Sequence, residues 1–432
     1  MITTPSENSE AEAYALRELR SGSPRSAVGN SLEEITVKTA ASQGTCVKAV
    51  ILAAGEGTRL DPVTNVRPKP MLPIANRPLL EYVVEAVSAA GIDEIVLVVG
   101  YERERIQSHF GDGDEWGIEI TYAVQETQLG TGDAILQTEP YIGGDFVVLN
   151  GDRIVESALI ERIVAERDRT GDTVMAVTRV AEPELYGVVE LDDGHVVTIE
   201  EKPPAHEVTS DLINAGVYAF GPEILAAIRQ TTTTGELGIT TTLETFLEAH
   251  PVRALTYRGS WLDVTRPWDV LAVNGQVLDE HGGSRGTNVR VDPSADVADL
   301  TALDDGSTIQ PGAVVLRGSS LGTNVTVGPN AVVENTVLLP DATVGAGAVL
   351  RDCIVGANTT IGPNATIEGG TADVVLEDTV HRDVRLGAMI GDNASLGGTV
   401  TLVPGTVVGN DAEIASGAVV DGHVAPGATV TR

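Results

Sequence analysis

The chain has 432 residues, and its 62 acidic against 28 basic residues leave a formal net charge of −34. This length accommodates two domains with sizeable cores, and the acidity excludes general binding to nucleic acid or to an anionic membrane. No apolar run reaches membrane-spanning length, and Cys46 and Cys353 are too few for a disulfide framework or a metal cluster.

These bulk features favour a reducing, cytoplasmic compartment. The chain contains only four lysines, Lys38, Lys48, Lys69 and Lys202. Acid excess with so few lysines suggests a halophilic protein, because high salt screens the repulsion between like charges. Residues 1–45 are rich in Ser, Thr, Glu and Ala and lack the apolar content of a core. We predict that they form a disordered extension without chemistry, or that the start codon is misplaced.

The predicted first domain covers residues 46–284 and begins with the apolar run 49–52, which indicates a buried parallel strand. A turn of small residues and two glycines follows, and backbone N–H groups in such a turn can approach a phosphate closely. Arg59 and Lys69 can then compensate phosphate charge, and nearby prolines stiffen the segment around Lys69. The expected nucleotide-binding residues here are Leu52, Ala53, Ala54, Gly55, Gly57 and Thr58.

Helices and strands are predicted to alternate after this turn. A helix is expected from Pro78, a strand over Glu94–Val99, a helix over Glu102–Phe110 and a strand over Ile118–Ala123. This alternation predicts an α/β fold of Rossmann-like character, with a mostly parallel, doubly wound sheet and ligands at the carboxyl ends of its strands.

Two polar segments follow predicted strands at that edge. Gln125, with the Gly130-Thr131 turn, can offer amide and backbone groups to a flat base, although an ordinary polar loop would look similar. Asp152 comes directly after the apolar run 146–149 and Gly151. A carboxylate in this place is suited to Mg²⁺, which prefers oxygen ligands. In isolation, Gly-Asp is more often a turn.

The predicted second domain covers residues 285–432 and shows a six-residue period. Aliphatic residues recur without a break at Ile309, Val315, Leu321, Val327, Val333 and Leu339, and again at Ile390, Leu396, Leu402, Val408, Ile414 and Val420. Three such hexads make one triangular coil, with the aliphatic side chains stacked inside, so we predict a left-handed parallel β-helix. Residues 368–389 interrupt the period, and a loop or irregular coil is expected there.

The combination of the strand at 49–52 with the segments LAAGEGTRL and RPKPMLPI resembles the signature of sugar-1-phosphate nucleotidylyltransferases. The resemblance implies Mg²⁺-dependent synthesis of an NDP-sugar and pyrophosphate from a sugar 1-phosphate and UTP or dTTP. It assigns a pyrimidine base to the segment around Gln125. It also implies that Asp263, in a Trp-x-Asp-like element, completes the metal site with Asp152.

Later segments resemble the sugar-binding parts of the same family. The resemblance implies close approach of the sugar at Gly187, a carboxylate from either Glu200 or Glu201 on its hydroxyls, Lys202 on its phosphate and Asn214 as a further ligand. For a Glu-Glu-Lys triplet alone, a solvated strand end would be the better interpretation.

Over residues 48–432 the chain resembles two-domain proteins that join uridylyltransferase and glucosamine-1-phosphate acetyltransferase activities; its first domain is also similar to glucose-1-phosphate thymidylyltransferases. At the family's acetyltransferase positions, Arg351 replaces the catalytic His and Ile354 the Tyr, and no lysine follows Lys202. His381 is a candidate base, and acetyl-CoA a co-substrate only if this domain is active. We favour a structural or regulatory β-helix that forms a homotrimer. A bifunctional enzyme and a non-catalytic sensor or scaffold are the alternatives.

Overall fold

The computed structural model describes residues 47–233, 235–376 and 379–431, which belong to one compact unit. The extension predicted at residues 1–45 lies outside the described residues. Among the described helices, none has both the length and the apolar character that crossing a bilayer requires.

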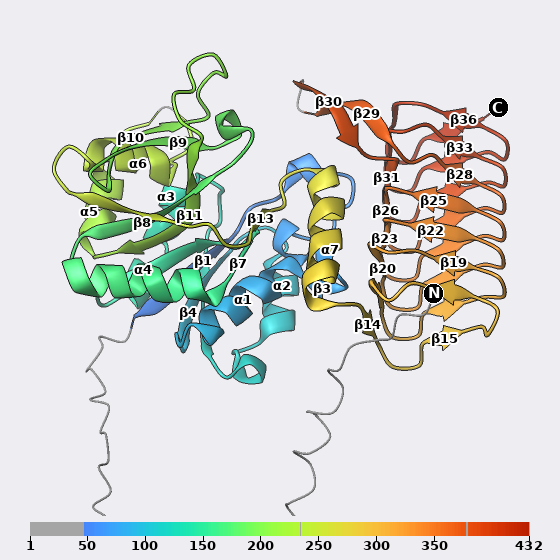
Figure 1. Ribbon diagram of the computed structural model, residues 1–432, viewed down its shortest axis with the longest axis horizontal. Coiled ribbons are helices and arrows are strands. Elements are labelled where there is room, and N and C mark those ends of the chain that lie inside the picture. The colour runs from blue at the N-terminus through green and yellow to red at the C-terminus, as the bar shows by residue number, and fades with distance from the viewer. Residues whose placement is uncertain (1–46, 234, 377–378, 432) are drawn as a thin grey trace, which may run out of the picture. The chain divides into compact units, whose positions relative to one another are not determined.

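The first part of the chain is built on a nine-stranded sheet (Figure 1). Its strand order is β5-β4-β1-β6-β11-β8-β12-β10-β9. The strands are β1 (Lys48–Ala53), β4 (Glu94–Val99), β5 (Glu119–Val124), β6 (Phe146–Asn150), β8 (Thr173–Arg179), β9 (Gly187–Asp192), β10 (His195–Glu201), β11 (Leu212–Phe220) and β12 (Val252–Thr256).

The predicted α/β fold is confirmed, and the sheet changes character along its width. Strand β1 pairs in parallel with β4 and β6, and β4 pairs in parallel with β5. Beyond β6 the directions are mixed, because β11 lies antiparallel between β6 and β8. The short Asp193-Gly194 turn joins β9 to β10, and a connection of that length forces the two strands to be antiparallel.

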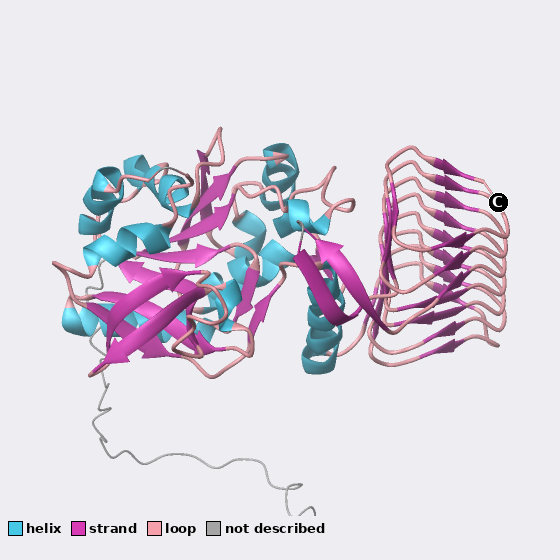
Figure 2. Ribbon diagram, turned by 90° about the horizontal axis from the view of Figure 1, so that it is seen from above, coloured by secondary structure: helices cyan, strands magenta, loops and turns pink. Residues whose placement is uncertain are grey.

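Helices cover both faces of this sheet (Figure 2). They are α1 (Leu79–Ala89), α2 (Arg103–Phe110), α3 (Thr131–Leu136), α4 (Ser157–Thr170), α5 (Glu223–Gln230) and α6 (Ile239–Phe246), with short 3-10 turns at η1 (Thr58–Leu60), η2 (Lys69–Met71), η3 (Asp114–Trp116), η4 (Glu139–Tyr141) and η5 (Pro183–Leu185). Helices α1, α2 and α4 pack on one face and α3, α5 and α6 on the other. In β1, Ile51 faces the first core and Val50 the second, which is why its sequence is apolar throughout.

Two small ladders lie beside the main sheet. Strand β2 (Pro73–Ile74) pairs with β3 (Arg77–Pro78), and β7 (Arg153–Val155) pairs with β13 (Trp261–Asp263) in antiparallel register. The second ladder places Asp263 opposite Arg153. Helix α7 (Pro267–His281) follows β13 and leads into the second part of the chain.

The second part is a left-handed parallel β-helix, as predicted (Figures 1 and 2). Its coils are stacked, and their strands form three parallel sheets, one on each face of the helix. The first sheet contains β14 (Ser284–Arg285), β17 (Thr301–Leu303), β20 (Ser319–Leu321), β23 (Val337–Leu338), β26 (Cys353–Val355), β31 (Ala388–Ile390), β34 (Thr406–Val408) and β37 (His423–Val424). The second contains β15 (Arg290–Val291), β18 (Thr308–Ile309), β21 (Thr326–Val327), β24 (Thr343–Val344), β27 (Thr360–Ile361), β32 (Ser395–Leu396), β35 (Glu413–Ile414) and β38 (Thr429–Val430). The third contains β16 (Asp296–Val297), β19 (Val314–Val315), β22 (Val332–Glu334), β25 (Val349–Arg351), β28 (Thr366–Ile367), β33 (Thr401–Leu402) and β36 (Val419–Val420).

One residue of the predicted interior stack, Leu339, was assigned wrongly. Val333 is inside, but the next interior residue of the first sheet is Leu338, and not Leu339. The pairing of Leu321 with Leu338 shows that this coil is one residue shorter than its predecessor, which pairs Leu303 with Leu321. Leu339 instead joins a core cluster that also contains residues of α7 and of the first part of the chain.

The interrupted segment is ordered where the structure describes it. Strands β29 (Thr371–Leu376) and β30 (Thr379–Arg385) pair as an antiparallel hairpin that leaves the coil between β28 and β31. A loop or irregular coil was expected at 368–389, whereas the structure shows a two-stranded extension. Alternation in TADVVL and TVHRDVR is consistent with strands, but the hexad period gives no sign of them.

Candidate active site

A pocket of about 260 Å³ opens at the carboxyl ends of β1 and β6. Several predicted nucleotide-binding residues line it, together with Lys69 and Asp152. The lining residues are Leu52, Ala53, Ala54, Gly55, Lys69, Pro70, Gln125, Gln128, Gly130, Thr131, Ala134, Asn150, Asp152 and Glu236. Gly57, Thr58 and Arg59 do not belong to this lining.

Gly57 lies outside the pocket lining and packs against the side chain of Lys69, which is part of it. Its φ of 79° lies in the left-handed region. A Cβ atom on Gly57 would lie 2.6 Å from the Cβ of Lys69, so a side chain here would displace the lysine. The first turn of the signature therefore allows the loop carrying Lys69 to pack against it.

The glutamines of the segment predicted to bind the base make hydrogen bonds that link the parts of the pocket. The Nε2 of Gln125 donates to the Gly130 carbonyl at 3.1 Å and to Asp133 Oδ2 at 2.8 Å. Both amide hydrogens therefore bond to groups of the same stretch of chain. Gln128 was not predicted as a site residue. Its Nε2 donates to the Ala54 carbonyl at 2.9 Å and thereby links this segment to the glycine-rich turn after β1. Its position in the same polar loop was the signal that could have identified it.

Asp152 and Asp263 form the acidic wall predicted to bind metal. The backbone of Val264 lies 3.5 Å from the Asp152 carbonyl, because β13 runs beside the residues that follow β6. The Oδ1 atoms of Asp152 and Asp263 are both buried, and neither has a hydrogen-bond partner among the described residues. Buried carboxylate oxygens left in this way suit a hard divalent cation, so the residues present fit Mg²⁺.

Basic groups balance this acidic wall. The Nζ of Lys69 lies 2.5 Å from Asp152 Oδ2, and the Nε of Arg153 lies 3.5 Å from Asp263 Oδ1. Burial by itself would raise the pKa of Asp152, but the charges of Lys69 and Arg153 outweigh it and lower that pKa. Asp152 therefore carries its negative charge at neutral pH.

Arg153 is a site residue that the sequence reading missed. Burial opposes its charge, but Asp263 and Asp152 outweigh burial and raise the pKa of its guanidinium group. The guanidinium lies over the rings of Tyr186 and Trp261, at 5.8 and 5.3 Å from their centroids. The Tyr186 hydroxyl also donates to Asp263 Oδ2 at 3.0 Å. The position of Arg153 directly after Asp152 was the signal in the sequence that could have identified it.

The predicted sugar-binding residues gather next to this wall. Glu201 pairs in register with Gly187 across β9 and β10, and a Cβ on Gly187 would lie 3.2 Å from Glu201 Oε2 and 3.6 Å from the Cβ of Asn214. The Oδ1 of Asn214 accepts the Gly216 N–H at 2.9 Å. These contacts bring Glu201, rather than Glu200, to Gly187 and Asn214.

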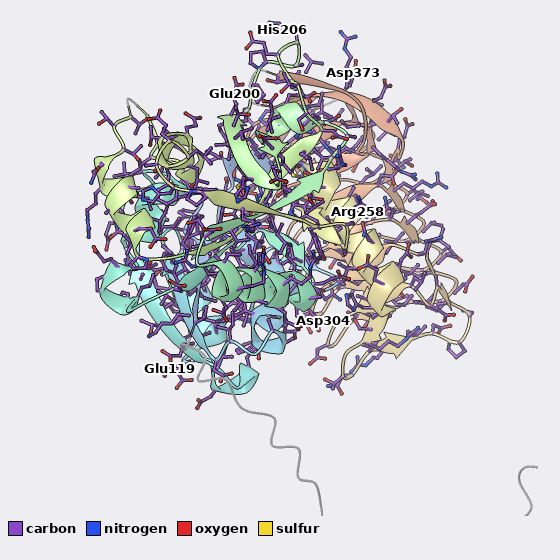
Figure 3. The ribbon with its side chains drawn as sticks, turned by 60° about the vertical axis from the view of Figure 1, so that its left-hand side comes forward. Glu119, Glu200, His206, Arg258, Asp304 and Asp373 are labelled. Carbon is purple, nitrogen blue, oxygen red and sulfur yellow. The ribbon has the colours of Figure 1, made fainter. Side chains whose placement is uncertain are left out.

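Glu200 and Lys202 are exposed on either side of Glu201. Glu200 lies on the side of the domain that carries the loop with His206 (Figure 3). The Lys202 side chain is about half exposed, with its Nζ 4.0 Å from Glu201 Oε1, and its N–H donates to the Tyr186 carbonyl at 2.9 Å.

His381, the candidate acetyltransferase base, contacts the first part of the chain. It lies on β30, and its ring centroid is 5.2 Å from that of Trp268 in α7. Burial, and then the positive charge of Arg266, lower the pKa of His381. Cys353, in β26, is a buried free thiol.

A glycine-rich pocket at the carboxyl ends of the strands of an α/β sheet is the arrangement of a nucleotide-binding fold. Residues 48–280 match the nucleotidyl transferase family model, and residues 288–432 match that of the GMPPB C-terminal domain. The chain belongs to the nucleotidyl transferase family and is a nucleotidyltransferase of the sugar-1-phosphate type.

Its relatives include Methanococcus proteins that are named bifunctional. It is 34% identical to "Bifunctional protein GlmU" of Methanococcus vannielii over 86% of this chain and 94% of that protein. It is 35% identical to a protein of the same name from Methanococcus maripaludis, over 61% of this chain and 62% of the relative. A solved putative glucose-1-phosphate thymidylyltransferase from Bacillus anthracis, in complex with a sucrose, is 28% identical with a TM-score of 0.51, over 54% of this chain and 96% of that one.

Proposed function

We propose that this nucleotidyltransferase joins UTP or dTTP to a sugar 1-phosphate and releases pyrophosphate. The observation that carries the proposal is the pair of buried carboxylate oxygens of Asp152 and Asp263, beside the glycine-rich pocket, that have no hydrogen-bond partner among the described residues. The sugar phosphate oxygen would attack the α-phosphorus in line, forming one P–O bond as the bond to pyrophosphate breaks. No protein nucleophile is required, so catalysis rests on positioning and charge stabilisation.

Each group that we assign to the reaction has a defined task. Lys69 and Arg59 would neutralise charge that builds on the triphosphate, and the backbone of Ala54 and Gly55 would carry its phosphates. Mg²⁺ on Asp152 and Asp263 would add Lewis-acid charge compensation when bound. Arg153 would hold Asp263 in place.

The sugar end follows from the contacts around Gly187. We propose that Glu201 and Asn214 accept and donate hydrogen bonds to sugar hydroxyls, because both border the backbone at Gly187. Lys202 would meet the sugar phosphate. Gln125 would present its amide oxygen, and not its amide hydrogens, to the base, since the hydrogens are used by Gly130 and Asp133.

A panel of assays in molar KCl with Mg²⁺ tests the proposal. UTP or dTTP is paired with glucose 1-phosphate, glucosamine 1-phosphate or N-acetylglucosamine 1-phosphate, and pyrophosphate release is measured. Release with one pair above all others would identify the substrates. No release with any pair would refute the proposed reaction and favour a sensor or scaffold. Activity that survives only in high salt would support the halophilic assignment.

Acetyl transfer by the β-helix domain is a second candidate because the relatives are named bifunctional. Against it, His381 packs on Trp268 of the first part of the chain. Free thiol released from acetyl-CoA with glucosamine 1-phosphate would establish this activity. The trimer through the β-helix and the cytoplasmic compartment stay predictions; light scattering tests the trimer.

A further inference from the structure

Two residues before Lys69, the signature loop makes a buried ion pair with the β-helix. The Nη2 of Arg67 donates to Asp392 Oδ2 at 3.0 Å, and its Nη1 donates to Asp392 Oδ1 at 3.3 Å. The two side chains are only 12% and 7% exposed. A two-point pair of this kind fixes the direction of the guanidinium as well as its distance.

Asp392 is held in place by the coils on both sides of its own. Its Oδ1 accepts the Ala357 N–H at 2.8 Å from the preceding coil. Its own N–H donates to Asn410 Oδ1 at 2.8 Å in the following coil. Stacked parallel coils are rigid, because each backbone pairs with the next. The carboxylate that Arg67 contacts is therefore a fixed point.

On its other side, Arg67 is tied into the loop that shapes the pocket. Its Nη1 donates to the Val63 carbonyl at 2.7 Å. The neighbouring Thr64 hydroxyl lies 3.0 Å from the Gly57 carbonyl, and Gly57 packs on the Lys69 side chain. The guanidinium thus links the β-helix to the signature loop at Val63, beside the residue that contacts Gly57.

The chain from Arg67 to Lys69 has few free torsions. Pro68 fixes its own φ at −67° and restricts Arg67 before it, and Pro70 restricts Lys69 in the same way. Lys69 then begins the 3-10 turn η2 and reaches Asp152. These restrictions limit how far Arg67 can move without moving the lysine in the pocket.

We propose that Asp392 of the β-helix is a positioning residue for nucleotidyl transfer, which it serves by holding Arg67 and through it Lys69. The inference rests on the function proposed above. It gives the β-helix a direct part in the reaction of the other domain, beyond any part in assembly. Small misplacements of a catalytic group cost up to ~100-fold in rate, so a loosened but intact loop should lose about tenfold.

The full-length chain offers a matched control for this test. Asp392→Asn removes the ion pair but keeps an oxygen for the Ala357 N–H. Asp279→Asn removes a different ion pair with the β-helix, which α7 makes and the signature loop does not. In that pair Asp279 Oδ1 lies 2.9 Å from Arg317 Nη2. That pair is exposed on both sides, and Asp279 lies in the last turn of α7. Arg67→Gln removes the same ion pair from the side of the signature loop and changes no residue of the β-helix.

We expect Asp392→Asn and Arg67→Gln each to lower kcat about tenfold, with the KM for the sugar phosphate little changed. Both variants should also lower the melting temperature, because each leaves one partner of a buried pair uncompensated. Asp279→Asn should retain the parent kcat. The double variant should be no slower than the slower single variant, because both remove one contact.

Parent-like kcat in either folded variant would overturn the inference, and so would an equal loss in Asp279→Asn or additive losses in the double variant. If Asp392→Asn fails to fold, Arg67→Gln alone decides. An inactive parent enzyme would instead refute the proposed function and, with it, this inference.

Discussion

Replacing Asp152 by Asn is the sharpest test of the acidic wall. The change keeps the size of the side chain and one carbonyl oxygen but removes the negative charge that Lys69 and Arg153 share. It also removes one of the two buried carboxylate oxygens assigned to Mg²⁺. Loss of one such charge-compensating group costs ~10²–10³ in kcat, which corresponds to ~2.7–4 kcal/mol of transition-state stabilisation.

The two ends of β6 supply a control for this variant. Asp145 precedes β6 as Asp152 follows it, and it pairs with Arg167 at 2.7 Å as Asp152 pairs with Lys69 at 2.5 Å. Both carboxylate side chains are 30% exposed. Asp145→Asn should therefore lower the melting temperature as much as Asp152→Asn does, but leave kcat within about twofold of the parent.

The assay is initial-rate pyrophosphate release against Mg²⁺ concentration, with circular dichroism to show that each variant is folded. Asp152→Asn should lower kcat and raise the Mg²⁺ concentration needed for half-maximal rate. If Asp152→Asn keeps the parent rate at saturating Mg²⁺, the metal assignment is wrong. If Asp145→Asn loses as much activity, the effect belongs to the stability of the strand and not to the site.

Three further predictions concern packing and charge. Burial raises the pKa of Cys353 to about 12, so a Cys46→Ser variant should react with a thiol reagent at about pH 8 only after denaturation; labelling of the native protein would contradict this. The pKa of Asp269 is raised to about 6, mainly by burial, so the folded state holds this proton more tightly and stability falls as the pH rises from about 4 to 6. Asp269→Asn should gain up to ~3 kcal/mol relative to the parent across that window in urea denaturation, whereas a difference independent of pH would refute the assignment. Gly216, with φ of 74°, lies against the Arg153 side chain, so Gly216→Ala should cost ~1–3 kcal/mol and lower the melting temperature; an unchanged melting temperature would show that the backbone relaxes there.

Much of the site could be predicted because its groups are close together in the sequence. The strand 49–52, the glycine turn and Lys69 lie within one short segment, and the structure brings them to one pocket with Asp152. Parallel strands bring their carboxyl ends to one edge, so residues that follow β1 and β6 had to meet. Arg153 and Gln128 were missed although they lie beside predicted residues, because neither charge nor amide type alone indicates where a side chain points.

By itself, the sequence determined the enzyme family and both fold classes, because these depend on local signals. The glycine-rich turn indicated the enzyme family, strand–helix alternation the α/β fold, and the six-residue period the β-helix. The tertiary structure decided what depends on packing between distant segments. It placed β11 antiparallel between β6 and β8, turned Leu339 out of the β-helix interior and set Glu201 rather than Glu200 against Gly187. The pair between Arg67 and Asp392 joins residues 325 positions apart, and no periodicity or motif spans that distance. Such contacts follow from how the α/β part of the chain and the β-helix pack against each other, in a core cluster that residues of both share.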